Sequence, residues 1–229
     1  FVIMWNNRNA KRKHTGTLIK WYKSFLDQLN QEQSEKCVLL LHTDPKDPYG
    51  QDVQAILEDF DLMEGQVLVS KEKVPPENLT MMYNISDVTV NISDAEGFGL
   101  GTLESLSCGT PIIVTMTGGL QEQVTDGENW FGVGIEPCSK ALIGSQQVPY
   151  IYEDRISEAD FIDALKKVFN MSREEREELG QKGREHVLKN YNFENFEKTW
   201  VDIITKIHED HGSWDTRKGH ESWKIMEIE

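Results

Sequence analysis

Two glutamates on either side of a glycine-rich turn are the residues of this sequence whose spacing best suits chemistry. Glu96 and Glu104 enclose residues 97–103, which include three glycines, and this segment follows an apolar run at residues 88–92. A strand that leads into a glycine-rich turn and then into a helix directs backbone N–H groups and the helix dipole at a phosphate. Carboxylates beside that phosphate can accept hydrogen bonds from sugar hydroxyls. The pattern therefore predicts a pocket for a nucleotide sugar, bound through its diphosphate.

The densest basic cluster of the chain follows its first predicted strand. Residues 6–14 include Arg8 and Lys13. An arginine offers a planar fork for a bidentate phosphate contact and a lysine offers a mobile point charge, so this pair could neutralise a diphosphate leaving group without a metal. Basic runs are about as often solvated surface. The position at the carboxyl end of a strand favours the phosphate role.

Each of these residues also has a plainer explanation. Gly97, Gly99 and Gly101 could serve a tight strand-to-helix turn that needs positive φ and nothing more. Glu104 could be a solvated helix residue, but it lies near the start of a predicted helix and faces the loop, which favours binding. Glu122 could equally well balance a helix dipole. We therefore expect function at Glu96 and Glu104 and keep both roles open for Glu122.

Two patterns of potential metal ligands occur, and neither predicts a metal site. Asp59 and Asp61 form a D-x-D pattern, but such a site needs the end of a strand, and here the pattern ends a predicted helix. Residues 208–211 contain two histidines without the i, i+4 spacing of a helical zinc site. We expect no metal.

The elements that must position these residues alternate along the chain. Apolar runs of strand length are separated by stretches of helical period, which is the pattern of a parallel sheet with helices on both faces. We predict strands at residues 1–5, 37–42, 66–69, 87–92 and 111–115, and helices at residues 18–29, 51–60, 76–84 and 99–108. This is an α/β fold with a Rossmann-like, doubly wound parallel sheet. Such sheets bind ligands outside the carboxyl ends of their strands, where residues 6–14, 70–75 and 93–97 would meet.

Beyond residue 115 the pattern loosens. Residues 130–154 mix glycine, proline and polar residues without a clear period, and we interpret them as a long ordered insertion. Helical period returns after Ser157, a potential N-cap, and after the capping box that starts at Ser172, and a last helix is predicted at residues 194–207. From residue 208 the chain is polar and of mixed charge. We therefore predict one domain at residues 1–207 and a polar tail at residues 208–229.

Charge and cysteine content exclude several classes of protein. A formal net charge of −15 repels polyanions, so nucleic acid is not an expected partner. The three cysteines are scattered and indicate neither a disulfide framework nor a zinc knuckle, which favours a reducing compartment. The sequence starts without a basic leader, and no apolar run approaches the roughly 20 residues of a membrane span. We expect a cytoplasmic protein without a transmembrane segment.

Several motifs occur together in an order that is more specific than any one of them. Along the chain they are Asn7-Arg8-Asn9 with Arg12-Lys13, Ser93-x-x-Glu96-Gly97-Phe98-Gly99-Leu100, Glu104, Gly109-Thr110-Pro111 and Gly118-Gly119-x-x-Glu122. With this set the chain resembles, over roughly residues 1–207, the carboxyl-terminal, donor-binding domain of the retaining GT-B-fold glycosyltransferases of family 4, the glycosyl transferases group 1.

The resemblance implies a role for each matching residue. Glu96 corresponds to the first glutamate of the family's E-x7-E motif, which contacts the donor sugar, and Glu104 corresponds to the second, which binds ribose hydroxyls. Arg8 and Lys13 correspond to the basic pair that holds the pyrophosphate and stabilises the departing diphosphate, while Glu96 orients the sugar. The remaining matches are the turn whose backbone amides meet the phosphates and the sugar, Gly97, Phe98, Gly99 and Leu100, and the small polar position before it, Ser93.

The resemblance also implies a reaction and its partners. Family members transfer a sugar, here expected to be a hexosyl group, from a nucleotide-diphosphate sugar to an acceptor, with retention of configuration and no cofactor. Retention needs either a double displacement or same-face attack assisted by the leaving phosphate. No nucleophile is evident, and the resemblance favours the second route. The family's amino-terminal domain carries the acceptor site, so this chain alone is expected to bind donor and to transfer little. Residues 130–154 depart from the family pattern, and we expect acceptor or partner contacts there.

Three alternatives stay open on the sequence. A sugar-nucleotide epimerase of the same fold would share the phosphate site and would act without an acceptor. A phosphorylase would need a lysine-bound pyridoxal phosphate, and no lysine is placed for it. A non-catalytic or degenerate nucleotide-sugar-binding module would bind the donor and stay inactive even beside the missing domain. The identity of the nucleobase, which would face residues 70–74, is not specified by the sequence.

Overall fold

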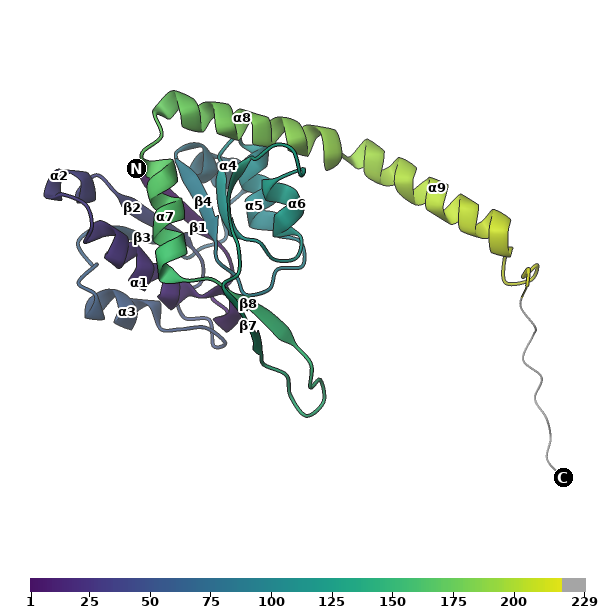
Figure 1. Cartoon of the computed structure of the whole chain (residues 1–229), viewed down its shortest axis with the longest axis horizontal. Helices are drawn as coiled ribbons and strands as arrows, with labels where there is room; N and C mark the ends of the chain where they lie inside the picture. Colours follow the sequence, from purple (N-terminus) through teal and green to yellow (C-terminus); the bar gives the residue numbers. More distant parts are fainter. Residues whose placement is uncertain (220–229) are drawn as a thin grey trace. The chain divides into compact units, whose positions relative to one another are not determined.

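The structure is a computed structural model that describes residues 1–219. It separates into two compact units, Phe1–Val187 and Leu188–Glu229. Within the first unit, parallel strands form one six-stranded sheet in the order β3-β2-β1-β4-β5-β6 (Figure 1). These strands are β1 Val2–Asn6, β2 Val38–His42, β3 Val67–Ser70, β4 Val88–Asn91, β5 Ile112–Thr115 and β6 Gly132–Ile135. The first five lie where the apolar runs predicted them, which confirms the predicted α/β sheet.

Helices follow most of the strands. They are the short 3-10 helix η1 Lys11–Lys13 and the α-helices α1 Thr15–Leu26, α2 Gln31–Ser34, α3 Val53–Asp59, α4 Pro76–Asn84, α5 Leu100–Ser107, α6 Leu120–Val124, α7 Glu158–Phe169, α8 Arg173–Asn190 and α9 Phe193–His211. The helix α8 continues past Val187, the last residue of the first unit, and α9 belongs to the second unit. Within residues 1–219, no helix is both long and apolar enough to span a bilayer.

The sheet lies between two layers of helices (Figure 1). Ile3 and Trp5 of β1 join the main hydrophobic cluster, which includes residues of α1, α3 and α7. Met4 lies between them, is equally buried, and is not part of that cluster. On the other face the hydroxyl of Ser105, from α5, donates to Thr89 Oγ1 of β4 at 2.8 Å. The helices α1, α3 and α7 thus cover one face, and α5 with its neighbours α4 and α6 covers the other.

The helix starts predicted at Ser157 and Ser172 are confirmed. Ser157 Oγ accepts from the backbone N–H of Asp160 at 3.1 Å. Ser172 Oγ accepts from the N–H of Glu175 at 3.1 Å, and the Glu175 carboxylate accepts from the N–H of Ser172 at 2.7 Å. These bonds satisfy N–H groups at the helix starts that would otherwise lack partners.

The segment interpreted as a long ordered insertion contains three strands that the sequence did not predict. The strand β6 completes the main sheet, and β7 Ser139–Leu142 pairs with β8 Tyr152–Arg155 as an antiparallel hairpin. Two glycines in β6 hid its apolar pattern, and the sheet requires at least the first of them. A Cβ at Gly132 would lie 2.1 Å from the backbone oxygen of Ile112, so only glycine allows this approach.

In the second unit, α9 is longer than the sequence predicted. It begins one residue after Asn192, whose side chain accepts from the N–H of Asn195 at 2.8 Å. It continues to His211 and is followed by Gly212 at φ 74, a positive φ that glycine adopts readily. The predicted end at residue 207 rested on the polarity of residues 208–211, but polar residues continue a helix readily. Residues 220–229 of the predicted tail lie outside the described residues.

Candidate active site

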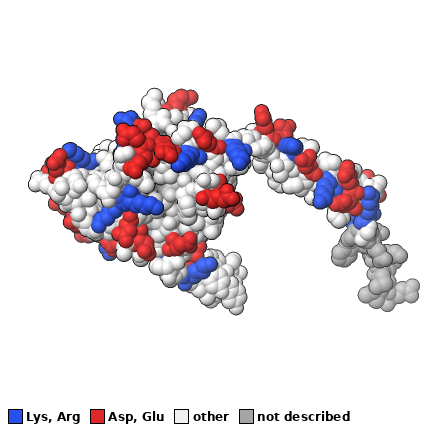
Figure 2. Space-filling view, turned by 45° about the horizontal axis from the view of Figure 1, so that its top comes forward, with Lys and Arg blue, Asp and Glu red and all other residues white. Residues whose placement is uncertain are grey.

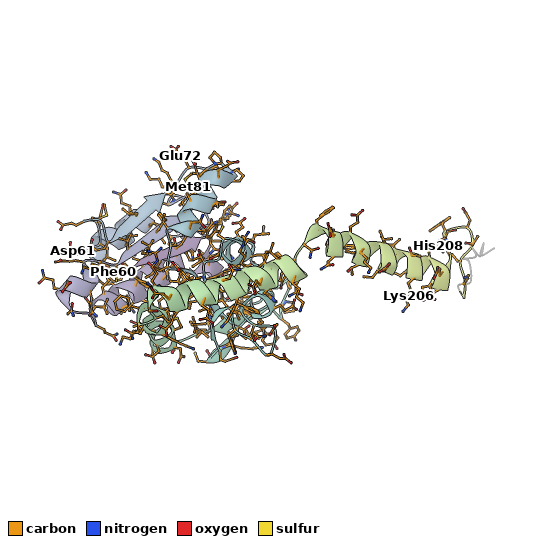
Figure 3. All side chains as sticks on the ribbon, turned by 90° about the horizontal axis from the view of Figure 1, so that it is seen from above. Phe60, Asp61, Glu72, Met81, Lys206 and His208 are labelled. Atoms are coloured by element: carbon orange, nitrogen blue, oxygen red, sulfur yellow. The ribbon has the colours of Figure 1, made fainter. Side chains whose placement is uncertain are left out.

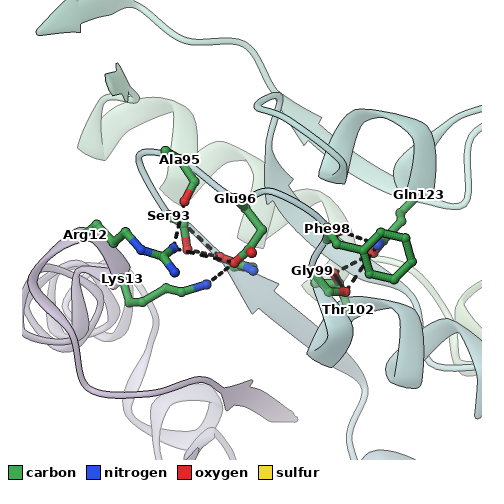
Figure 4. Close-up of polar contacts among 10 residues, drawn as sticks. Arg12, Lys13, Ser93, Ala95, Glu96, Phe98, Gly99, Thr102 and Gln123 are labelled. Carbon is green, nitrogen blue, oxygen red and sulfur yellow. Dashed lines mark hydrogen bonds and ion pairs between the residues drawn. The ribbon is translucent and has the colours of Figure 1, made fainter. Parts of the chain in front are cut away.

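The segments that follow β1 and β4 meet at the carboxyl edge of the sheet, because these two strands are neighbours. The N–H of Asp94 donates to the backbone oxygen of Arg12 at 3.1 Å. The Arg12 guanidinium in turn donates to the backbone oxygen of Ala95 at 2.8 Å (Figure 4). Backbone and side-chain bonds therefore hold the two loops together before any ligand is considered.

Lys13 and Glu96 form an ion pair between these loops (Figure 4). Lys13 is the last residue of η1 and is only 6% exposed. The guanidinium of Arg12 lies 3.8 Å from the same carboxylate oxygen. Burial acts to raise the pKa of Glu96, but the hydrogen bond and the charge of Lys13 outweigh it, so that the pKa lies below its ordinary value. Glu96 is therefore ionised at neutral pH.

The turn after Glu96 is braced from behind by the loop that follows β5. The N–H of Gly119 donates to the backbone oxygen of Glu96 at 3.1 Å. Gly118 adopts φ 48, and a Cβ there would lie 1.9 Å from that same oxygen. The paired glycines that the sequence placed in the motif ending at Glu122 thus allow one loop to lie directly on another.

Two buried polar side chains that the sequence analysis missed fix the far end of this turn. Gln123 is fully buried, and its amide donates to the backbone oxygen of Phe98 at 2.6 Å and to that of Gly99 at 3.2 Å (Figure 4). The hydroxyl of Thr102 bonds to Gln123 Oε1 at 2.6 Å. Because the carbonyls of the turn point to Gln123, the opposite side of the turn remains for a ligand.

That opposite side is open. An added Cβ at Gly97 would meet no atom within 4 Å, and the side chains of Phe98 and Leu100 are exposed. Gly99, at φ 91, precedes α5 and has no side chain with which to cap it. The N–H groups in the first turn of a helix without a cap can donate to an anion, and the helix dipole favours negative charge there. This turn can therefore bind a phosphate.

Glu104 lies one turn into α5 and is held by hydrogen bonds to neutral groups. The hydroxyl of Tyr83 donates to Glu104 Oε2 at 2.8 Å. The Asn6 amide lies 2.7 Å from that hydroxyl and 3.4 Å from Oε2. Among the described residues Glu104 has no ion-pair partner, so its second oxygen can accept from a ligand. Gly101 permits this approach of α5 to β1, since its Cβ would lie 2.7 Å from the backbone oxygen of Asn6.

Arg8 lies on the other side of β1 from the Glu96 turn. Its guanidinium donates to both oxygens of Asp47, at 2.6 and 3.2 Å, and stacks over the ring of Tyr49 at 5.2 Å. These partners belong to the loop after β2, which neighbours β1 in the sheet. The Arg8 side chain is 61% exposed. The structure thus joins Lys13, Glu96 and Glu104 around one turn and holds Arg8 in a separate pair.

The remaining residues singled out by sequence lie around this turn or away from it. Ser93 is fully buried, and its N–H and hydroxyl both bond to Asn91 Oδ1, so it shapes the backbone before Glu96. Phe60 packs against the core at the end of α3 while Asp61 points outward at the periphery (Figure 3). Within residues 1–219, no group of three His, Cys, Asp or Glu side chains could hold a metal ion.

Taken together, the parallel sheet and the glycine-rich turn between Glu96 and Glu104 define a Rossmann-like fold of the GT-B glycosyltransferase type, as predicted. Residues 7–186 match the family model described as Glycosyl transferases group 1. Since this match covers most of the chain, the chain belongs to that family.

Curated relatives carry several functions. A D-inositol 3-phosphate glycosyltransferase of Acidothermus cellulolyticus is 39% identical over 82 residues, which are 35% of this chain and 18% of that protein. A trehalose synthase of Pyrococcus horikoshii is 25% identical over 194 residues, which are 83% of this chain and 40% of that protein. The matched part is less than half the length of either relative.

Solved structures show the same fold. Sucrose-phosphate synthase of Thermosynechococcus elongatus gives a TM-score of 0.68 at 22% identity and covers 91% of this chain and 46% of that chain. The C-terminal domain of a glycosyl transferase group 1 family protein from Francisella tularensis gives 0.62 at 20% identity and covers 84% of this chain and 87% of that chain. The second match agrees with the predicted correspondence to a carboxyl-terminal domain.

Proposed function

We propose that this chain binds the nucleotide-diphosphate sugar of a retaining, metal-independent glycosyltransferase that transfers a hexosyl group to an acceptor. One observation carries the proposal, the arrangement of Lys13 with Glu96 before the uncapped start of α5 and of Glu104 after it. Family membership supports the chemistry of sugar transfer. We assign acceptor binding to a further domain, since this chain covers 46% of a related synthase.

Each group then has a distinct task. The diphosphate sits on the first-turn amides of α5, and Lys13 supplies the positive charge that stabilises it as it leaves. Glu96, ionised at neutral pH, accepts hydrogen bonds from the sugar hydroxyls. Glu104 accepts hydrogen bonds from the ribose hydroxyls through Oε1, the carboxylate oxygen that Tyr83 does not contact. Arg8 releases Asp47 and then contacts the diphosphate.

Retention follows from attack on the face that the diphosphate leaves. The acceptor hydroxyl oxygen bonds to the anomeric carbon while the bond from that carbon to the diphosphate oxygen breaks, and a leaving phosphate oxygen takes the hydroxyl proton. Among the candidate residues, Glu96 is already engaged by Lys13 and Glu104 by Tyr83, which favours this route over a covalent intermediate on either carboxylate.

Binding of nucleoside diphosphates tests the proposal directly. We expect at least one of uridine, guanosine and adenosine diphosphate to bind the chain in calorimetry, and the ribose form to bind more tightly than its 2′-deoxy analogue. A charge-assisted hydrogen bond is worth about 1.5 to 3 kcal/mol, so Glu104→Ala should weaken binding of the ribose form by roughly tenfold or more. The same variant should bind ribose and deoxyribose forms equally, because the discriminating carboxylate is gone.

The matched control is Glu58→Ala, which removes an exposed helical glutamate whose carboxylate accepts from Gln54 within α3. This variant should bind like the wild type, and urea unfolding should show that both variants are folded. Failure of all three diphosphates to bind would contradict the proposed function. Equal loss of both sugar forms in Glu104→Ala would instead remove Glu104 from the ribose site.

We further propose a reducing, cytoplasmic location. The proposal is supported by the three free cysteines of the structure, Cys37, Cys108 and Cys138. Mass spectrometry of protein taken from cells under acid quench should find all three as thiols, and a disulfide among them would contradict it.

A further inference from the structure

The hairpin of β7 and β8 is tied at its base to the loop that carries Glu96. The N–H of Asp154 donates to the backbone oxygen of Asp94 at 2.9 Å. The guanidinium of the next residue, Arg155, forms an ion pair with the Asp94 carboxylate and lies 3.0 Å from Glu153. The far end of the hairpin, residues 141–152, carries no charged residue and is white in Figure 2. The charges of the hairpin are thus gathered where it meets the site.

Asp94 connects three segments of the chain. Its backbone N–H donates to the backbone oxygen of Arg12, and its own backbone oxygen accepts from the hairpin. Asp94 is only 4% exposed, and its carboxylate contacts both Arg155 and His14. His14 Nε2 lies 2.5 Å from Asp94 Oδ2. Lys13 precedes His14 and Glu96 lies two residues after Asp94, so a contact that fixes Asp94 and His14 also restrains the Lys13 and Glu96 pair.

His14 is held in a conformation that costs free energy. It has φ 59, in the left-handed region that residues other than glycine rarely adopt, and it immediately precedes α1. A non-glycine residue stays in this region only when its surroundings hold it there. The contacts of its ring are Asp94 at one nitrogen and the hydroxyl of Thr17, 3.4 Å away, at the other. Arg155 lies 3.0 Å from the same ring nitrogen as Asp94.

Arg155 therefore acts where it balances a nearly buried carboxylate. Without it, the side-chain partner that Asp94 keeps among the described residues is His14, and burial lowers the pKa of that histidine, which disfavours its charged form. A nearly buried carboxylate without a cation is costly, so the loop would relax toward water.

From these contacts we propose that Arg155 of the hairpin is a positioning residue that holds Asp94 and His14, and through them sets Lys13 and Glu96 in place for the diphosphate. The proposal rests on the proposed function for its effect on binding, but not for its effect on the loops. The base of the inserted hairpin thus supports the donor site without contacting the donor.

The first test needs no ligand. Arg155→Met should raise amide hydrogen exchange at Asp94, whose N–H bonds to Arg12 across the tied loops, and at His14, whose N–H bonds to Lys11 at the end of η1. Lys140→Met is the matched control, because Lys140 pairs with Asp154 at 3.6 Å on the same hairpin but does not contact Asp94. This control should exchange like the wild type. Unchanged exchange at His14 and Asp94 in Arg155→Met would overturn the proposal whatever the chain binds.

The second test is nucleotide affinity. With the nucleoside diphosphate that binds best among those of uridine, guanosine and adenosine, Arg155→Met should weaken binding about tenfold, and Lys140→Met should not. Because Lys13 is the group displaced, Arg155→Met should add little to Lys13→Met in a double-mutant cycle. Raised exchange with unchanged affinity would leave Arg155 as a structural contact only and overturn its positioning role.

The conservative variant Arg155→Lys separates a loss of positioning from a loss of folding. A lysine keeps the charge and loses the fork, so it should restore part of the exchange protection and part of the affinity. A full loss equal to that of the methionine variant, in protein that urea unfolding shows to be folded, would also count against positioning by charge. If the wild type bound no nucleoside diphosphate, the proposed function would be wrong. The exchange result would still show whether Arg155 holds Asp94 and His14 in place.

Discussion

The two ends of the basic segment after β1 differ in almost every physical respect. Lys13 is nearly buried, and its partner Glu96 lies on a loop that other loops brace from two sides. Arg8 is mostly exposed, and its partner Asp47 lies on a loop across the neighbouring strand β2. Both residues are cations of one basic segment, and the sequence analysis assigned both of them to the diphosphate. The structure makes one of them a fixed part of the site and the other a group that can move.

This difference suggests a division of labour. A buried charge that is already positioned stabilises a leaving group without reorganisation when the reaction occurs. An ion pair whose arginine is exposed contributes little to stability, and such an arginine can exchange its carboxylate partner for a phosphate at small cost. We therefore expect changes at Lys13 to lower the stability of the fold, and changes at Arg8 to affect ligand binding without affecting stability.

The largest effect is expected from Gly118→Ala, which tests whether the Lys13 side rests on a rigid loop. A Cβ here would lie 1.9 Å from the backbone oxygen of Glu96, and φ 48 adds strain, so we expect a loss of about 3 kcal/mol in unfolding free energy. Gly97→Ala, which meets no atom within 4 Å, is the control and should lose less than about 1 kcal/mol in urea unfolding. Similar losses for the two variants would show that the loop at Gly118 moves aside easily and does not hold the Glu96 turn rigidly.

Lys13→Met should have the next largest effect. It leaves the Glu96 carboxylate without its main partner in a partly buried place, which should cost about 2 kcal/mol of unfolding free energy. Adding Glu96→Gln removes the unpaired charge and should recover part of that loss, a coupling that a double-mutant cycle in urea measures. Simple additivity of the two changes would contradict a direct pair.

The third prediction concerns acid. Because the pKa of Glu96 lies below its ordinary value, its pairing stabilises the fold at neutral pH and loses that contribution as pH falls through the folded-state pKa. The difference in unfolding free energy between wild type and Lys13→Met should be constant above about pH 5 and should shrink below about pH 4. Urea unfolding at a series of pH values measures it. A difference that grows on acidification would mean that Glu96 is not the partner.

These contrasts also separate what sequence reasoning reached from what it missed. The first five strands were predicted because each is a short apolar run, and the Glu96 and Glu104 turn was predicted because its residues are adjacent in sequence. The supports of that turn come from distant positions. Gln123 bonds to Thr102 across 21 residues, and Arg155 bonds to Asp94 across 61 residues. Such contacts leave no local pattern, since neither partner is unusual in its own segment.

The strand β6 illustrates a second kind of failure. Its glycines lower strand propensity, yet Gly132 is there because the neighbouring strand approaches too closely for a side chain. The glycine that packing requires at this position is thus the residue that made the strand hard to predict from propensity. His14 is a second case, because its left-handed backbone and its contact with Asp94 left no pattern in the sequence. Tertiary contacts decide both cases.

The smallest effect on stability is expected from Arg8→Met, and this variant tests the comparison most sharply. The Arg8 side chain is exposed, and Asp47 keeps the backbone N–H of Tyr49 as a donor when the arginine is removed, so the urea midpoint should change little. If Arg8 leaves Asp47 for the diphosphate, Arg8→Met should nevertheless weaken nucleoside diphosphate binding several-fold in calorimetry, and more at low salt than at high salt. Asp47→Asn should strengthen binding, because it removes the competing carboxylate. Unchanged affinity in both variants would assign the diphosphate charge to Lys13 alone and leave Arg8 as a surface residue.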